Sequence, residues 1–252
     1  MQVAEHGGAT RWDSGQVNSS VAHLVPYGGP PLTNGSSYAW RVRVGAAPCS
    51  ASSEWSAWFV FAVLPSQDAW ARVPWFGGPG LHRATLGRAG TLLAVACAGY
   101  YEAYIDGVRV GDHVLAPGWT TYSARVLVDV FNVSGMAGTA STFGLALGNG
   151  TFGHFWGQLP RCKVLLDGEP VSGFRTNPGP IVASDIYLGE VYDARLEQDG
   201  WATPAFNASS WPLSPILPNI TGGGSGEDWR PPGPPLMVAR LEPPQVDDKL
   251  GE

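Results

Sequence analysis

The sequence predicts an all-β fold, and three observations carry that prediction. Glycine and proline are abundant, with 34 and 22 residues in a chain of 252, and this favours many turns and few helices. Several segments alternate apolar and polar side chains, as half-buried strands do. No segment sustains the 3.6-residue period of an amphipathic helix. An antiparallel β-sandwich is the simplest architecture with these features.

Residues 1–64 predict short strands separated by turns. Residues 36–45, SSYAWRVRVG, alternate so that Tyr38 and Trp40 share one face, together with Val42 and Val44. Residues 55–63, WSAWFVFAV, predict a second strand. An immunoglobulin-like domain needs about seven strands and about 100 residues. The segment therefore predicts only the later part of such a domain.

Residues 65–215 predict a longer β unit. An apolar strand at 91–99, TLLAVACAG, is followed by a hairpin at 100–112 whose turn is Asp106-Gly107. Asp-Gly pairs favour the tight two-residue turns of hairpins. A second such hairpin is expected around Asp167-Gly168. Residues 216–252 are rich in glycine and proline and then in charge, which predicts a linker or an extended arm.

The first hairpin strand carries three tyrosines whose faces can be told apart. Tyr101 and Ile105 share one parity, whereas Tyr100 and Tyr104 share the other with Glu102. Because side chains alternate across a strand, the glutamate marks the wetter face. We expect Tyr101 and Ile105 in the core, and Tyr100 and Tyr104 on a partly covered face that meets another domain.

Charge and hydropathy exclude several classes of protein. The net charge is −6, and no lysine or arginine cluster occurs, which argues against nucleic acid and anionic membranes as partners. No apolar run approaches the ~20 residues of a membrane span. The first residues, MQVAEHGGAT, show no signal peptide. Six glycosylation sequons nevertheless suggest a secreted or extracellular protein: Asn18, Asn34, Asn132, Asn149, Asn207 and Asn219.

The three cysteines are too few for a disulfide scaffold. Cys97 lies in an apolar run and is interpreted as a small buried hydrophobic residue. One bridge between Cys49 and Cys162 is an option, and three free thiols are the equal alternative.

Three long motifs occur in order in the middle of the chain: GYYEAYIDGVRVGDHVLAPGWTTYSARVLVDVFNV, LALGNGTFGHFWG and GPIVASDIYLGEVYDARLEQDGWATPAFNASSW. Together they resemble the N-terminal β-sandwich domain of α-L-rhamnosidases. Residues 1–64 resemble the tail of the fibronectin type III-like domain that precedes it, and PPLMVARLEP resembles the strand that leads out of the sandwich. The resemblance implies an all-β fold: a jelly-roll-like antiparallel β-sandwich preceded by a partial fibronectin type III or immunoglobulin-like segment.

The resemblance also implies an accessory role. In that family an (α/α)6 barrel downstream performs an inverting hydrolysis with a pair of carboxyl groups. The acidic residues here match the sandwich motif instead, and no barrel is expected within these 252 residues. We expect a non-catalytic portion that supports the barrel and helps to hold rhamnose-containing glycan. The alternatives are a free-standing carbohydrate-binding module and a cell-surface adhesion fragment.

Two sets of residues are candidates for a ligand site. Trp119 and Trp156 lie in glycine-rich loops, where aromatic rings stack on sugars or simply close one end of the sandwich. The segment SDIYLGEVYDAR supplies three carboxylates that could hold Ca²⁺, Asp185, Glu190 and Asp193. Its Tyr187, Tyr192 and Arg195 complete the candidate set. The competing interpretation is a structural network in which Arg195 pairs with a carboxylate.

Other site patterns are missing from the sequence. The five histidines, His6, His23, His82, His113 and His154, have no metal-ligand spacing. No Gly-X-Ser-X-Gly elbow occurs. The glycine-rich stretch GGPGLHRATLGRAG lacks the Lys-Ser/Thr ending of a phosphate loop. The sequence therefore supports no nucleotide cofactor.

Overall fold

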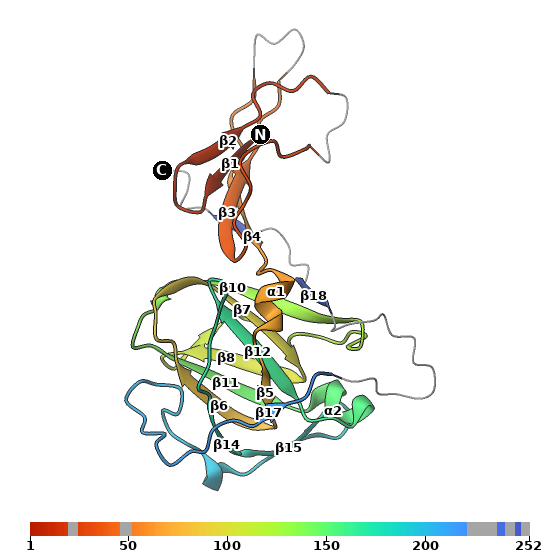
Figure 1. Ribbon diagram of the computed structural model, residues 1–252, viewed down its shortest axis with the longest axis vertical. Helices are drawn as coiled ribbons and strands as arrows, with labels where there is room; N and C mark the ends of the chain where they lie inside the picture. The colour runs from red at the N-terminus through yellow and green to blue at the C-terminus, as the bar shows by residue number, and fades with distance from the viewer. Residues whose placement is uncertain (20–24, 46–51, 221–235, 240–244, 248–252) are drawn as a thin grey trace. The chain divides into compact units, whose positions relative to one another are not determined.

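The computed structural model describes residues 1–19, 25–45, 52–220, 236–239 and 245–247. The chain divides into two compact units, residues 1–64 with 241–252, and residues 65–240 (Figure 1). Strands dominate both, which confirms the predicted all-β class. Within the described ranges, no helix is long and apolar enough to cross a membrane.

The smaller unit is built on one five-stranded sheet with the order β19-β4-β3-β1-β2. Its strands are β1 (Gln2–Glu5), β2 (Thr10–Asp13), β3 (Ser36–Arg41), β4 (Trp58–Val63) and β19 (Gln245–Asp247). The predicted strands at 36–45 and 55–63 are therefore shorter than expected. Beyond Arg41 the pairing is irregular: the Ser56 amide donates to the Val42 carbonyl at 2.8 Å, whereas the Val42 amide donates to Ser56 Oγ at 3.0 Å. Val44, expected on the face of Tyr38, is 70% exposed.

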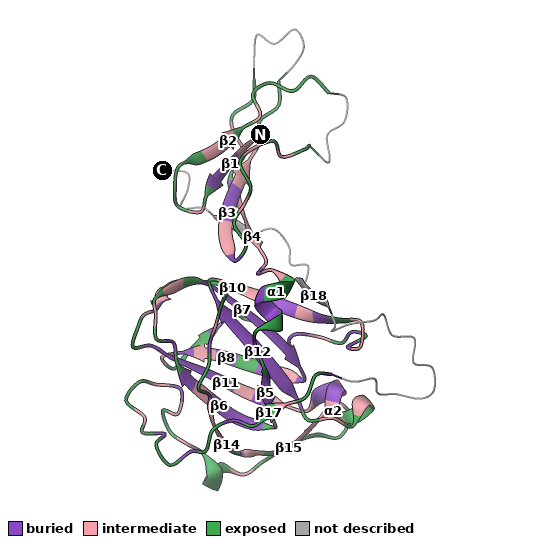
Figure 2. Ribbon diagram, viewed as in Figure 1, coloured by how far each residue is buried: buried purple, intermediate pink, exposed green. Residues whose placement is uncertain are grey.

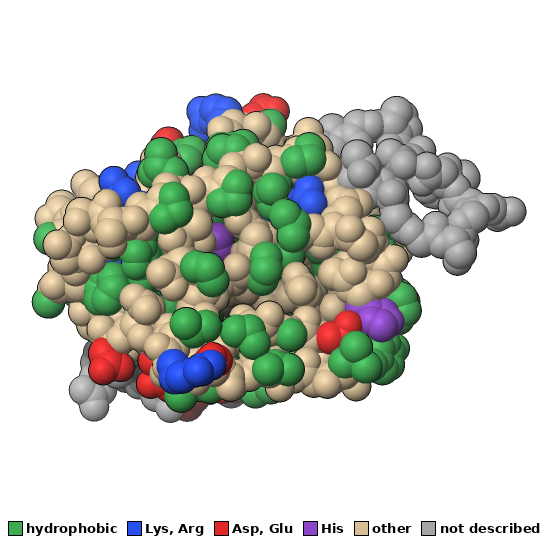
Figure 3. Space-filling model, turned by 90° about the horizontal axis from the view of Figure 1, so that it is seen from below, with side chains coloured by type: hydrophobic (Ala, Val, Ile, Leu, Met, Phe, Trp, Pro, Cys, Tyr) green, Lys and Arg blue, Asp and Glu red, His purple; other side chains and the backbone are tan. Residues whose placement is uncertain are grey.

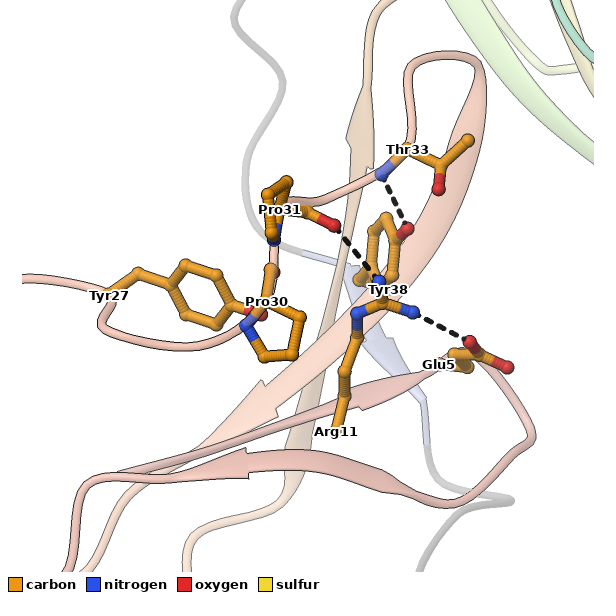
Figure 4. Close-up of polar contacts among 7 residues, drawn as sticks. All are labelled: Glu5, Arg11, Tyr27, Pro30, Pro31, Thr33 and Tyr38. Atoms are coloured by element: carbon orange, nitrogen blue, oxygen red, sulfur yellow. Dashed lines mark hydrogen bonds and ion pairs between the residues drawn. The ribbon is translucent and has the colours of Figure 1, made fainter.

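A loop is fastened to this sheet by polar contacts (Figure 4). Arg11 forms an ion pair with Glu5 at 3.0 Å and donates to the Pro31 carbonyl at 2.9 Å. The Thr33 amide donates to the hydroxyl of the buried Tyr38 at 2.8 Å. These bonds compensate for a small apolar core of Ala4, Ala39 and Trp58.

The larger unit contains two main sheets. One has the order β17-β5-β12-β7-β10-β18, with β13 paired to β12; the other has the order β14-β6-β11-β8-β9. The strands of the first are β5 (Trp75–Gly77), β7 (Gly90–Ala98), β10 (Arg125–Ala137), β12 (Arg161–Leu166), β13 (Glu169–Pro170), β17 (Ile216–Leu217) and β18 (Leu236–Ala239). Those of the second are β6 (Gly80–Thr85), β8 (Tyr100–Ile105), β9 (Val108–Val110), β11 (Thr142–Gly148) and β14 (Arg175–Asn177).

Buried side chains concentrate in these strands (Figure 2). Alternate residues form the main apolar cluster, such as Leu93 and Val95 of β7, and Phe143 and Leu145 of β11. Because successive side chains point to opposite faces, each strand offers one set to this core. The predicted sandwich is thereby confirmed, with β18 beside β10 as a parallel neighbour among otherwise antiparallel described pairs.

Both expected hairpin turns are present. Asp106 and Gly107 have φ values of 50° and 82°, and Asp167 and Gly168 have 48° and 78°. Positive φ at both central residues matches the twist of the flanking strands. Consequently Ile105 pairs with Val108, and Leu166 pairs with Glu169.

The expected orientation of the first hairpin strand is confirmed. Tyr101 and Ile105 are 6% and 1% exposed, whereas Tyr100 and Tyr104 are half-buried and Glu102 is exposed. Tyr101 also donates its hydroxyl to Asp129 over 2.5 Å in the interior. The tyrosines of this strand are therefore divided between the core and a semi-covered face.

Both alternatives considered for the cysteines, a Cys49–Cys162 bridge and three free thiols, are wrong. Cys97 is bonded to Cys162, and both are fully buried. The two residues lie directly opposite each other on β7 and β12, a register that links segments far apart in the sequence. Cys49, the partner proposed from sequence, lies outside the described residues.

The outer face of the first sheet is covered too. Helix α1 (Gln67–Ala71) begins at Ser66, whose side chain accepts from the Ala69 amide, and it buries Trp70. Lys163 of β12 is 6% exposed and donates to the Trp70 carbonyl at 2.9 Å. This cover explains why every residue of β12 is buried.

Candidate functional site

A short helix organises one edge of the larger unit. Helix α2 (Gly150–Trp156) follows β11 and is flanked by Asn149 and by Gly157 at φ 58°. A Cβ on Gly150 would lie 2.7 Å from the Tyr100 ring. Only glycine permits this close approach, so the Gly-Asn-Gly turn positions α2 against β8.

An aromatic series runs outward from the interior along α2. Tyr122 is 1% exposed and meets Phe152 and Trp156 edge-on, with ring centroids 5.0 and 5.1 Å apart. Trp156 in turn lies 6.4 Å from Trp119, which is 66% exposed. Both tryptophans predicted as candidates are thus brought together, one half-buried and one at the surface.

The hairpin of β15 (Ile181–Asp185) and β16 (Gly189–Tyr192) is fastened to α2 through Asp185. One carboxylate oxygen of Asp185 accepts from the amides of Tyr187 and Leu188, at 2.8 and 3.0 Å. The other lies 2.7 Å from His154 Nδ1. The backbone bonds from Leu188 and Tyr187, and then His154, hold the pKa of Asp185 below its ordinary value. The carboxylate is therefore already committed to shaping this turn.

We define the aromatic surface as Trp119, Phe155, Trp156 and Tyr187. Phe155 is 45% exposed and Tyr187 69% exposed, with ring centroids 5.9 Å apart. Sequence reasoning missed Phe155 and the role of His154, which packs 5.1 Å from Tyr187. A usable signal was their position between two glycines in GHFWG, which places them on a short exposed helix.

The remaining candidates pair among themselves. Arg195 binds both carboxylate oxygens of Asp193, at 2.8 and 2.6 Å, and this pair lowers the pKa of Asp193. Tyr192 donates to Glu197 at 2.6 Å, and this bond raises the Tyr192 pKa. Glu190 lies opposite Ser184 on the neighbouring strand. Asp193 and Arg195 therefore form the structural pair that the competing interpretation expected.

The predicted Ca²⁺ set is not assembled. Asp185 begins the hairpin turn, whereas Tyr192, next to Asp193, pairs with Ile181 at the far end. Asp185 and Ile181 are four residues apart along β15, so the two ends of the hairpin are separated by roughly 13 Å. Among the described residues, no group of three His, Cys, Asp or Glu side chains could hold a metal ion. The carboxylates Asp185, Glu190 and Asp193 therefore do not fit one shared calcium ion.

The same hairpin and the 3-10 turn Ala194–Leu196 that follows it expose apolar side chains. We call Val182, Leu188, Val191 and Leu196 the hairpin patch; they are 54, 86, 58 and 42% exposed. Figure 3 shows the face that carries β14 and β15, where hydrophobic side chains are spread between small groups of charged ones. Exposed apolar side chains concentrated on one hairpin and the turn after it indicate an interaction site.

The six sequon asparagines differ in exposure. Asn18, Asn34, Asn132, Asn207 and Asn219 are exposed, and Asn149 is half-buried beside α2.

Two family models match the chain. The alpha-L-rhamnosidase N-terminal domain matches residues 88–171 and 164–221. The Rha78A-like, N-terminal immunoglobulin domain matches residues 1–64. The two matched regions correspond to the smaller unit's N-terminal segment and to most of the sandwich.

Curated relatives and solved structures agree with these matches. An alpha-L-rhamnosidase of Streptomyces avermitilis is 36% identical over 47% of this chain and 13% of its own length. One of Formosa agariphila is 27% identical over 82% of this chain and 27% of its own.

Among solved structures, the alpha-L-rhamnosidases of Dictyoglumus thermophilum and Aspergillus terreus each superpose with a TM-score of 0.72 and 26% identity. The Dictyoglumus match covers 96% of this chain and 31% of that one, and the Aspergillus match covers 87% and 29%. This chain thus spans less than a third of each of these proteins. It belongs to the alpha-L-rhamnosidase family and corresponds to the N-terminal portion of its members.

Proposed function

We propose that this chain is a non-catalytic accessory portion of an α-L-rhamnosidase-like protein, and that it supports a downstream (α/α)6 catalytic barrel. One observation carries the proposal: the β15–β16 hairpin is capped at both ends yet presents apolar side chains to solvent. Two turns fix its shape, since Asp185 caps one end and Asp193 caps the 3-10 turn Ala194–Leu196 at the other. A fixed apolar surface is suited to docking against another folded domain.

The chain's coverage of its relatives agrees with a docking role. The solved relatives are more than three times as long as the aligned part, which represents 29–31% of them. A partner domain within the same protein would cover the hairpin patch and remove Leu188, now 86% exposed, from water. Burying a leucine side chain stabilises an interface by about 1.5–3 kcal/mol.

A second function, binding of rhamnose-containing glycan, is favoured by the aromatic surface. Trp119 and Tyr187 are largely exposed, and His154 of α2 packs against Tyr187 and contacts Asp185. Rings of this kind stack on the CH groups of sugars while nearby polar groups orient the hydroxyls.

The docking proposal can be tested by mixing the chain with the catalytic barrel of its parent protein, expressed as a separate polypeptide. We expect a complex in sedimentation velocity that Leu188→Ser weakens at least tenfold. Val108→Ser is the matched control, because Val108 is 60% exposed on the separate β8–β9 hairpin. Equal effects of the two substitutions would refute docking through the hairpin patch.

Glycan binding is separated from docking by calorimetry with L-rhamnose. Trp119→Ala should abolish binding and Leu188→Ser should leave it unchanged. Rhamnose binding without any barrel association would instead identify a free-standing carbohydrate-binding module. Failure of both measurements would favour the adhesion-fragment alternative.

We infer an extracellular location from the exposed sequons, of which Asn207 is one. Expression through a eukaryotic secretory pathway should give a mass shift that peptide N-glycosidase removes. An unmodified secreted product would argue against this location.

A further inference from the structure

Two arginines face each other across neighbouring strands of the larger unit. Arg83 of β6 and Arg175 of β14 are directly paired in the antiparallel register. Like charges in this arrangement destabilise a sheet. None of the ion pairs found among the described residues involves either guanidinium. The pair therefore places two uncompensated positive charges together in a protein of net charge −6.

Neutral carbonyls account for part of this arrangement. Arg83 donates to the carbonyls of Phe206 and Thr203, both at 2.8 Å. Arg175 Nη1 donates to the Trp211 carbonyl at 2.5 Å. These bonds fasten the segment 203–211 onto the sheet, but carbonyl dipoles do not neutralise the charges. Burial also lowers the pKa of Arg83.

A cavity of about 210 Å³ opens beside the two arginines. Its lining also includes Thr85 and Ser209, both exposed. Among the described residues, Nε and Nη2 of Arg175 have no hydrogen-bond partner. The hydroxyls of Thr85 and Ser209 have none either. At about 30 Å³ per water, the volume holds roughly seven waters, which is below the about 300–1,000 Å³ of drug-sized pockets. The cavity therefore suits a single small ligand.

We propose that this cavity binds one small oxyanion, a carboxylate or a sulfate group, between Arg175 and Arg83. The Nε–Nη2 edge of Arg175 has the geometry that grips two oxygens at once. The Thr85 and Ser209 hydroxyls supply further donors at the rim. A bound anion would offset the repulsion between the paired guanidiniums, so binding stabilises the fold. This site lies on β6 and β14 and is independent of the proposed docking and glycan functions.

The test is thermal unfolding and calorimetry of the intact chain with sodium sulfate, sodium D-glucuronate or D-glucose, at constant ionic strength set with sodium chloride. We expect saturable binding and a raised Tm with sulfate or glucuronate, and neither with glucose. A response to sulfate alone identifies a free inorganic anion as the ligand, and a stronger response to glucuronate identifies the carboxylate of an acidic sugar.

Arg175→Gln should weaken binding at least about tenfold, since the loss of a hydrogen bond to a charged group reduces affinity by about that factor. Arg109→Gln is the matched control, because Arg109 pairs with Glu102 away from the cavity. Arg175→Gln also loses its bond to Trp211, so Thr85→Val provides a second variant without a structural bond. Thr85→Val should weaken binding several-fold while keeping the ligand-free Tm.

Three results would overturn the proposal. They are the absence of saturable binding to either anion, equal binding by wild type and both cavity variants, and binding of D-glucose as strong as that of the anions.

Discussion

His154 on helix α2 and Asp185 at the β15–β16 turn are joined by a contact of 2.7 Å between Nδ1 and Oδ2. This contact connects the helix that carries Phe155 and Trp156 to the turn that carries Tyr187. The same aspartate caps two amides of the turn. One side chain therefore determines how the aromatic surface and the hairpin are positioned.

Asp185→Ala should loosen the turn without unfolding the sandwich. We expect hydrogen exchange of the Tyr187 and Leu188 amides to accelerate several-fold, because both lose their acceptor. Since the folded pKa of Asp185 is lowered, the wild-type protection should be complete above the ordinary carboxyl range and disappear as the pH falls through that lowered pKa. Asp193→Ala, a control at the far end of the hairpin, should leave these two amides unchanged. Unchanged exchange in Asp185→Ala would contradict the capping role.

His82 should make the fold sensitive to mild acid. The side chain is fully buried, with Nε2 donating to the Gly78 carbonyl at 2.8 Å and Nδ1 accepting from Ser214 at 2.9 Å. Burial lowers the pKa of His82 from 6.5 to about 4, against the effect of the Gly78 bond. The unfolded chain binds the proton first, so stability is complete above pH 6.5 and decreases toward pH 4, by about 3 kcal/mol.

Urea unfolding at several pH values would measure this loss. His82→Gln should remove the slope between pH 6.5 and 4, even though the variant is less stable at neutral pH. A slope of the same size in the variant would assign the acid sensitivity to other groups.

Lys163 should make the stability of the fold depend on pH in the alkaline range. Burial beneath α1 lowers its pKa from 10.5 to about 8. Between these values the unfolded chain holds more protons, so stability should increase with pH, by about 3 kcal/mol in total. Lys163→Met keeps a side chain of similar length and should be at least as stable as wild type at pH 7. Its own stability should lack the rise that the wild type shows between pH 8 and 10.5. Marked destabilisation by Lys163→Met would show that the bond to Trp70 outweighs the desolvation cost.

The Cys97–Cys162 bridge closes a segment with a sequence separation of 65 residues. Reduction, or Cys97→Ala with Cys162→Ala, should lower the free energy of unfolding by about 2–4 kcal/mol. Denaturant titration with and without reductant measures the difference, and the double variant should not respond to reductant. Alkylation of the denatured, unreduced chain should label one thiol, and labelling of three would contradict the bridge.

Local chemistry explains what could be predicted from the sequence. The Asp106-Gly107 and Asp167-Gly168 turns depend only on two adjacent residues, and the parity of Tyr101 and Ile105 depends on one strand. The pairing of Cys97 with Cys162 depends on the register of β7 and β12, and no local pattern encodes it. The contact between His154 and Asp185 is equally non-local. Trp119 and Trp156 were identified singly, but their meeting beside Tyr122 required the fold.

The central claim is that this portion of an alpha-L-rhamnosidase-like protein carries no catalytic pair. The most direct measurement is the release of rhamnose from an aryl α-L-rhamnoside by the purified 252-residue protein. The account predicts no release above the uncatalysed rate. Turnover that persists through purification and disappears in Glu190→Gln would contradict it.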